Sequence, residues 1–117
     1  MALKELGSPD ELMNFINSNE VCLVTFSAVW CGPCRASKPQ LEAMAKDALI
    51  PFGYVYESDL EDFLDIFVEI KAFPTHVCFK GGEEVHRVEG VNFQGIQEML
   101  LAHASSSSSM PETGGDS

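Results

Sequence analysis

The sequence predicts an α/β fold in which a central mixed sheet of five strands is flanked by four α-helices. Strand-like and helix-like segments alternate along the chain, which is typical of a sheet with helices on both faces. Gly81 and Gly82 join the last two strand-like segments as a hairpin, so this pair is antiparallel and the sheet is mixed. The length of 117 residues, of which 45% are hydrophobic and 21% charged, indicates one small domain.

The chain is expected to begin with a possible strand at 2–6 and an amphipathic helix. Ser8 can cap this helix, and Pro9 suits its first position. Glu11 then completes a capping box, and apolar residues at spacings of three and four continue the pattern to about 18–19.

The next segments predict a strand, a helix and a strand. Val21–Ser27 is a continuous apolar run rich in β-branched residues, as expected for a central strand covered on both faces. A helix should run from Pro33 to about Ala48, and Pro39 inside it should kink it. Phe52–Tyr56 is predicted to be a second central strand.

The last third predicts a short helix, a hairpin and a final helix. Glu57–Glu69 holds six acidic residues but keeps a helical apolar spacing, so it is expected to be a helix with an acidic face. Thr75–Lys80 and Glu84–Val88 are the predicted hairpin strands. Asn92 should cap the final helix.

The predicted domain covers residues 1–104, and residues 105–117 are expected to form a disordered tail. The tail is rich in Ser, Gly and Pro and has no apolar stripe. Met110–Gly114 resembles a sortase signal, but no apolar segment or basic end follows it.

The charge balance restricts the partners. Seven Lys and Arg against 18 Asp and Glu give a net charge of −11, which nucleic acid or an anionic membrane would repel. No run of 18 apolar residues predicts a membrane span, and no secretory leader is visible, so a cytoplasmic protein is expected. The acidic segment 57–69 has two interpretations: a solvated helix face, which is favoured, or a region that steers basic partners.

Two of the four cysteines form a Cys-x-x-Cys pair, Cys31 and Cys34, where a strand meets a helix. The unpaired N–H groups and positive dipole at the helix N-terminus stabilise a thiolate at Cys31, and the thiolate is the form that attacks a disulfide. Cys34, one turn further on, can then displace the product. Trp30 supplies an apolar platform, and Pro33 stiffens the turn.

A zinc site is the alternative interpretation of this pair. Zinc needs four ligands, usually from two such pairs or from one pair with closely spaced histidines. The chain has no second pair, and His76, His86 and His103 lack such spacing, so redox chemistry is favoured. The histidines are expected on a strand face or the surface, with no role. Of the remaining cysteines, Cys22 and Cys78 are interpreted as core packing in preference to regulatory thiols.

Taken together, the motifs resemble those of the thioredoxin family over about residues 3–103. They are Thr25-Phe-Ser-Ala-Val-Trp-Cys-Gly-Pro-Cys34, Lys38-Pro39, Ala72-Phe-Pro-Thr75, Phe79-Lys-Gly-Gly-Glu83 and Gly90. The resemblance implies a thioredoxin fold, with Cys31 as the nucleophile and Cys34 as the resolving cysteine. It also implies a cis peptide before Pro74, although propensity alone would favour a trans proline at the start of a strand.

The resemblance further implies a groove for a substrate peptide, made by Trp30, Gly32, Pro33, Phe73, Pro74 and the backbone around Gly90. The implied function is reduction of protein disulfides by a monomer without a cofactor, through a redox-active disulfide between Cys31 and Cys34. The implied partners are disulfide-containing proteins and a thioredoxin-reductase-type flavoprotein.

One position, Thr25, departs from the family pattern. Thioredoxins usually carry a buried Asp there, often paired with a Lys that lines up with Val55 or a neighbouring residue. The family acid is thought to accept the proton of the resolving cysteine, and a threonine does not titrate in this range. Thr25 is therefore expected to tune the rate, with Glu57 as a possible substitute acid. The alternative function is a thioredoxin-like binding or chaperone module in which redox turnover is incidental.

Overall fold

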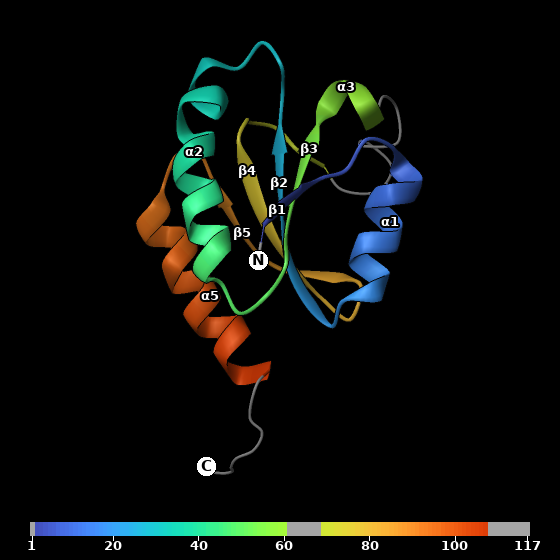
Figure 1. Cartoon of the computed structure of the whole chain (residues 1–117), viewed down its shortest axis with the longest axis vertical. Helices are drawn as coiled ribbons and strands as arrows, with labels where there is room; N and C mark the ends of the chain where they lie inside the picture. The colour runs from blue at the N-terminus through green and yellow to red at the C-terminus, as the bar shows by residue number, and fades with distance from the viewer. Residues whose placement is uncertain (1, 61–68, 108–117) are drawn as a thin grey trace.

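Five strands form one mixed sheet at the centre of the computed structural model, in the order β1-β3-β2-β4-β5 (Figure 1). The structure describes residues 2–60 and 69–107. The elements are β1 (Leu3–Glu5), α1 (Pro9–Ser18), β2 (Val21–Ser27), α2 (Gly32–Asp47), β3 (Phe52–Tyr56), α3 (Glu57–Leu60), β4 (Thr75–Lys80), β5 (Glu83–Glu89) and α5 (Phe93–Ser107). Strands β1, β3 and β2 pair in parallel, whereas β4 pairs antiparallel with β2 and β5, which confirms the predicted mixed sheet.

One of the two hydrogen bonds predicted for the N-terminal cap of α1 forms, and the other has a different partner. The Ser8 hydroxyl accepts from the Glu11 N–H at 3.2 Å, so Ser8 is the N-cap. The Glu11 carboxylate, however, accepts from the Gly7 N–H at 2.7 Å and so reaches one residue beyond the N–H that a capping box uses. The start of the helix was therefore predicted correctly. The second bond of the capping box, from the Ser8 N–H to the Glu11 carboxylate, was predicted wrongly.

The β4–β5 hairpin turns on two glycines with left-handed backbones. Gly81 has φ +62° and Gly82 has φ +85°, and the flanking residues Lys80 and Glu83 are paired across the ladder. A two-residue turn with positive φ at both positions matches the right-handed twist of the strands it joins. The hairpin prediction is confirmed.

Three predicted segments extend beyond the described residues or differ at their ends. Residues 61–68 of the acidic helix lie outside the described residues, and α3 covers only its first turn. The Asn92 side chain caps α5 by accepting from the Gly95 N–H at 2.9 Å, and the helix continues to Ser107, three residues past the expected domain end. Residues 108–117 lie outside the described residues, so the disordered tail stays a prediction.

Helices cover both faces of the sheet (Figure 1): α1 and α3 lie on one side, and α2 and α5 on the other. Each side has its own core. The α1-side core includes Leu12 and Ile16 of α1, Cys22, Val24 and Phe26 of β2, Val55 of β3 and Leu60 of α3. The α2-side core includes Leu41 and Ala45 of α2, Leu23 of β2, Tyr54 of β3, Cys78 of β4, Val88 of β5 and Ile96 and Met99 of α5.

Strand β2 lies in the middle of the sheet, and all seven of its residues are buried, as its apolar run predicted. Because side chains alternate along a strand, Thr25 shares the α2-side face with Leu23. The strand ends at Ser27, and α2 begins only a few residues later, at Gly32. The chain therefore passes directly from the centre of the sheet into the N-terminus of α2, with Pro39 inside that helix.

Candidate active site

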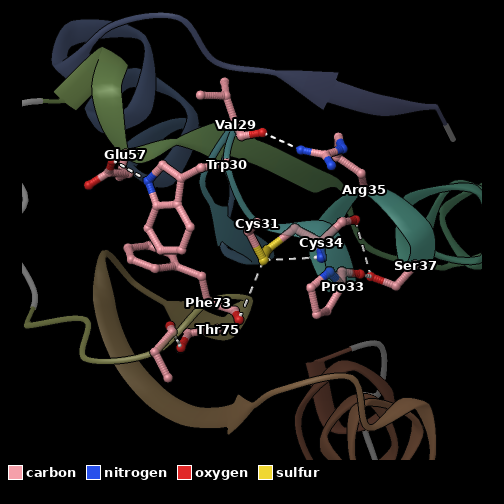
Figure 2. The surroundings of a disulfide bond; sticks show 11 residues. Val29, Trp30, Cys31, Pro33, Cys34, Arg35, Ser37, Glu57, Phe73 and Thr75 are labelled. Carbon is pink, nitrogen blue, oxygen red and sulfur yellow. Dashed lines mark hydrogen bonds between the residues drawn. A yellow bond between two sulfur atoms is a disulfide. The ribbon is translucent and has the colours of Figure 1, made fainter.

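Cys31 and Cys34 are joined by a disulfide at the N-terminus of α2 (Figure 2). Their Cα atoms are 5.3 Å apart, within the usual range for a disulfide. Cys31 is the N-cap of α2, and its Sγ accepts from the Cys34 N–H at 3.2 Å. The same N–H and the helix dipole would stabilise negative charge on Cys31 Sγ once the disulfide is reduced.

Both cysteines are nearly covered in this oxidised state. Cys31 is 4% exposed and Cys34 is 1% exposed, and they pack against Ala28 and Phe73. In the disulfide form, Cys31 is therefore a buried residue. Gly32 and Pro33, which lie between the two cysteines, are exposed. A partner must approach over these two residues or displace Phe73.

Trp30 and Phe73 meet beside the disulfide (Figure 2). Their rings pack edge to face, with centroids 5.7 Å apart and an angle of 87° between their planes. Trp30 is 65% exposed, and its indole N–H donates to the Glu57 carboxylate at 3.2 Å. The Phe73 carbonyl oxygen lies 3.6 Å from Cys31 Sγ, where a thiol proton would find an acceptor in the reduced protein. Glu57 thus binds Trp30, and no contact joins it to the sulfur atoms.

Pro74 and Gly90 lie next to each other. The Phe73–Pro74 peptide is cis, as the resemblance implied, so the trans alternative is excluded. The Gly90 N–H donates to the Pro74 carbonyl at 2.7 Å, and Gly90 has φ +83°. The structure therefore brings Trp30, the two cysteines, Phe73, Pro74 and Gly90 to one end of the sheet.

Thr25 has a hydrogen-bond partner that sequence reasoning missed. It pairs with His76 across β2 and β4, and Thr25 Oγ1 lies 2.7 Å from His76 Nδ1. Thr25 is 1% exposed and His76 is 3% exposed. His76 therefore lies on a strand face, one of its two expected positions, but it is a buried hydrogen-bonding residue, which corrects the expectation that it has no role. The signal was the position of His76 in an apolar strand, two residues after Pro74.

Val55, the position expected to line up with the family lysine, does not adjoin Thr25. Val55 belongs to the α1-side core, on the face of the sheet opposite Thr25. The residue beside Thr25 in the β2–β3 register is Tyr54, and the Lys38 Nζ lies 4.7 Å from the centre of the Tyr54 ring. Val55 is thus not a neighbour of the Thr25 side chain, and the cation nearest this part of β3 comes from α2.

Burial changes the pKa values of several groups in the sheet, among them His76, Cys22 and Cys78. Desolvation lowers the pKa of His76 to about 4, against an opposing hydrogen bond to the Gly90 backbone. Desolvation, together with the neighbouring Cys78, raises the pKa of Cys22 to about 12. Desolvation also raises the pKa of Cys78 to about 11, although the positive charge of Lys80 acts to lower it. His76 is therefore neutral at pH 7, and Cys22 and Cys78 are thiols, in agreement with a packing role.

The other two histidines form a pair away from the groove. His86 Nδ1 lies 3.1 Å from His103 Nε2, and the rings pack edge to face. Within residues 2–60 and 69–107, no group of three or more His, Cys, Asp and Glu side chains is arranged to hold a metal ion. In the same part of the chain, no helix is long and apolar enough to cross a membrane.

A sequence model of the thioredoxin family matches residues 6–102. This chain belongs to the thioredoxin family. It is 34% identical to a thioredoxin of Echinococcus granulosus, over 81% of this chain and 89% of that relative. It is 35% identical to thioredoxin-2 of Pyricularia oryzae over 92% of this chain, which spans 63% of that longer protein. The structure of Fasciola hepatica thioredoxin matches with a TM-score of 0.78 at 33% identity, over 86% of this chain and 99% of that one.

Membership of the thioredoxin family, together with the disulfide at the start of α2, identifies a thiol–disulfide oxidoreductase. A thiol at the N-terminus of a helix is favoured as the attacking thiolate, and a second thiol one turn later is at bonding distance from it. The zinc alternative is thereby set aside in favour of the redox interpretation.

Alkylation of the reduced protein at pH 7 should modify Cys31 first. At this pH only about one molecule in 10⁵ carries a Cys22 thiolate when the pKa is about 12, and only about one in 10⁴ a Cys78 thiolate. Cys31 is the N-cap and is more exposed than Cys34. Mass mapping after a short exposure to iodoacetamide checks the order, and earlier labelling of Cys78 would contradict it.

Proposed function

We propose that this protein reduces disulfides of other proteins, with Cys31 as the nucleophile and Cys34 as the resolving cysteine. The observation that supports these roles is the capping geometry. The Cys34 N–H donates to Cys31 Sγ, so a thiolate at Cys31 is stabilised and one at Cys34 is not.

The exchange runs in two displacements. The Cys31 thiolate attacks one sulfur of the substrate disulfide, forming a mixed disulfide and releasing the other substrate sulfur as a thiolate, which takes a proton from water. The Cys34 thiol then loses its proton and attacks Cys31 Sγ, which forms the Cys31–Cys34 disulfide and releases the second substrate thiol. Counted from the dithiol, whose Cys31 gives its proton to water before the attack, the substrate gains two electrons and two protons, and the protein loses the same.

The cycle closes when another protein reduces the disulfide. We propose a thioredoxin-reductase-type flavoprotein as this donor, and disulfide-containing proteins as the acceptors. The redox-active disulfide is then the only redox group of the protein, which acts as a monomer without a cofactor. Such a dithiol must work where thiols are kept reduced, and Cys22 and Cys78 are free thiols in the core, so we propose a cytoplasmic location.

The groove proposed for the substrate backbone is made by Trp30, Gly32, Pro33, Phe73, Pro74 and Gly90. Its support is the exposed Trp30 ring, the Phe73 carbonyl oxygen 3.6 Å from Cys31 Sγ, and the adjoining Pro74 and Gly90 backbones. An extended peptide that pairs with these backbones could place a cysteine over Cys31.

Insulin reduction tests the proposal. With dithiothreitol as the donor, the purified protein should precipitate the insulin B chain many times per molecule, at a rate proportional to the protein concentration. A binding or chaperone module would instead suppress aggregation of an unfolded, cysteine-free protein without turning over insulin. That result would overturn the proposed reductase.

A further inference from the structure

His76 is a buried titratable side chain that takes no direct part in the disulfide exchange. Its Nδ1 lies 2.7 Å from Thr25 Oγ1 on β2, and its ring also hydrogen-bonds to the backbone of Gly90. Gly90 lies between the end of β5 and the start of α5. One side chain therefore connects the middle strand of the sheet to the loop beside the groove.

The direction of both hydrogen bonds follows from the chemistry of the neutral ring. The bond to Gly90 favours the protonated imidazole, so the Gly90 group is the carbonyl oxygen, which can only accept. A neutral imidazole has one N–H, and the Gly90 carbonyl takes it. The Nδ1 atom is then an acceptor, and the Thr25 hydroxyl donates to it. Each of the three polar groups is thus satisfied in the core.

Both backbone polar groups of Gly90, its N–H and its carbonyl, are consequently hydrogen-bonded. Its N–H donates to the Pro74 carbonyl at 2.7 Å, and its carbonyl accepts from His76. A φ of +83° is a conformation that glycine adopts without the strain of a Cβ, but glycine also has the most conformational freedom to lose. Two hydrogen bonds therefore fix a backbone that would otherwise be the most flexible part of the groove.

We propose that His76 is a positioning residue for substrate binding: with Thr25 behind it, it holds the Gly90 backbone in the orientation that an extended substrate peptide meets. This inference rests on the proposed function, because it takes the groove at Pro74 and Gly90 as the substrate site. A Gly90 backbone that is already ordered does not have to lose conformational freedom when the substrate binds. The contribution of His76 should therefore appear in the substrate affinity more than in the rate of exchange.

Steady-state insulin reduction by three variants tests this role. His76→Leu fills a similar volume but removes both hydrogen bonds, and it should raise KM for insulin about five-fold with kcat within two-fold of wild type, because one hydrogen bond is typically worth a factor of that size. His76→Gln keeps a donor and an acceptor without a titratable group, and it should recover most of the affinity. Cys78→Ala, a packing change two residues along the same face of β4, is the matched control and should leave KM unchanged.

Hydrogen exchange at one amide gives a second readout. The Gly90 N–H should exchange faster in His76→Leu than in wild type, while the core amides of β2 keep their protection. Should His76→Leu fail to fold, Thr25→Val removes the bond to Nδ1 alone and should raise KM about two-fold.

Three outcomes would overturn the inference. The first is an unchanged KM in a folded His76→Leu or Thr25→Val protein that reduces insulin normally. The second is a fall in kcat with KM unchanged, which would place His76 in the exchange chemistry. The third is an equal rise in KM for Cys78→Ala, which would make the effect one of general packing. A wild-type protein that does not reduce insulin at all would instead remove the proposed function, and this inference with it.

Discussion

The Cys31→Ser variant should lose insulin reduction by at least about 10³-fold, the scale on which removal of an attacking nucleophile acts. Serine keeps the capping oxygen at the start of α2 but is not ionised at neutral pH and cannot form a disulfide. None of the other cysteines can replace it. Cys34 is 1% exposed and lies a turn inside the helix, and burial holds the pKa of both Cys22 and Cys78 at about 11 or above.

The Cys34→Ser variant should behave differently, because only the second displacement is lost. The Cys31 thiolate can still attack, so the mixed disulfide with a substrate accumulates in a one-to-one complex that a reducing agent dissolves. Non-reducing mass spectrometry of the variant mixed with a disulfide-bonded protein measures this complex. Cys22→Ala serves as the control and should turn over at the wild-type rate. A complex trapped by Cys31→Ser, and not by Cys34→Ser, would reverse the roles of the two cysteines.

Acidification should destabilise the fold by about 3 kcal/mol through His76 alone. Its pKa is 6.5 in an unfolded chain and about 4 in the folded protein, and each unit of difference corresponds to about 1.4 kcal/mol. Because the folded pKa is the lower one, this stability is fully present above pH 6.5 and is lost as the pH falls toward 4. Protonation would place a charge between Thr25 and Gly90 and would leave the Thr25 hydroxyl without its acceptor.

The side chain that contacts His76 in the described structure, Thr25 on β2, carries no charge to compensate. Tyr54, beside Thr25 on β3, is neutral, and Lys38 of α2, which lies over the Tyr54 ring, would only repel an imidazolium. Urea unfolding at pH 7, 6, 5 and 4 measures the loss. His76→Gln should be less sensitive to acid than wild type by about 3 kcal/mol. His103→Gln should change the dependence in the same direction but by less, because desolvation also lowers the pKa of that partly exposed ring. Equal pH dependence in wild type and His76→Gln would refute the prediction.

The sequence predicted the elements well because their signals are local. The apolar run Val21–Ser27, the Ser8 cap and the two hairpin glycines each specify a backbone conformation within a few residues. The Cys-x-x-Cys pair needed only the strand before it and the helix after it to indicate its chemistry. Deviations are confined to details that depend on side-chain reach, such as the Glu11 carboxylate bonding to Gly7.

The environment of Thr25 could not be predicted in the same way. Its hydrogen-bond partner lies 51 residues away, and the two meet only because β2 and β4 pair antiparallel in one register. A shift of that register by one residue would turn His76 to the other face of the sheet. The burial of Cys31 could not be predicted for a related reason, because it depends on Phe73, from a segment far along the chain.

The placement of the two remaining cysteines determines how many electrons the protein can hold. Cys22 lies in the α1-side core and Cys78 in the α2-side core, so their side chains point to opposite faces of the sheet. Side chains that diverge in this way cannot be bridged by a disulfide without moving the backbone. The folded protein therefore has a single redox couple of two electrons, and its oxidised fraction should follow one Nernst curve of about 30 mV per decade. Excess oxidant cannot form a second disulfide between the core cysteines, so the redox state of the cysteines is set by the Cys31–Cys34 bond.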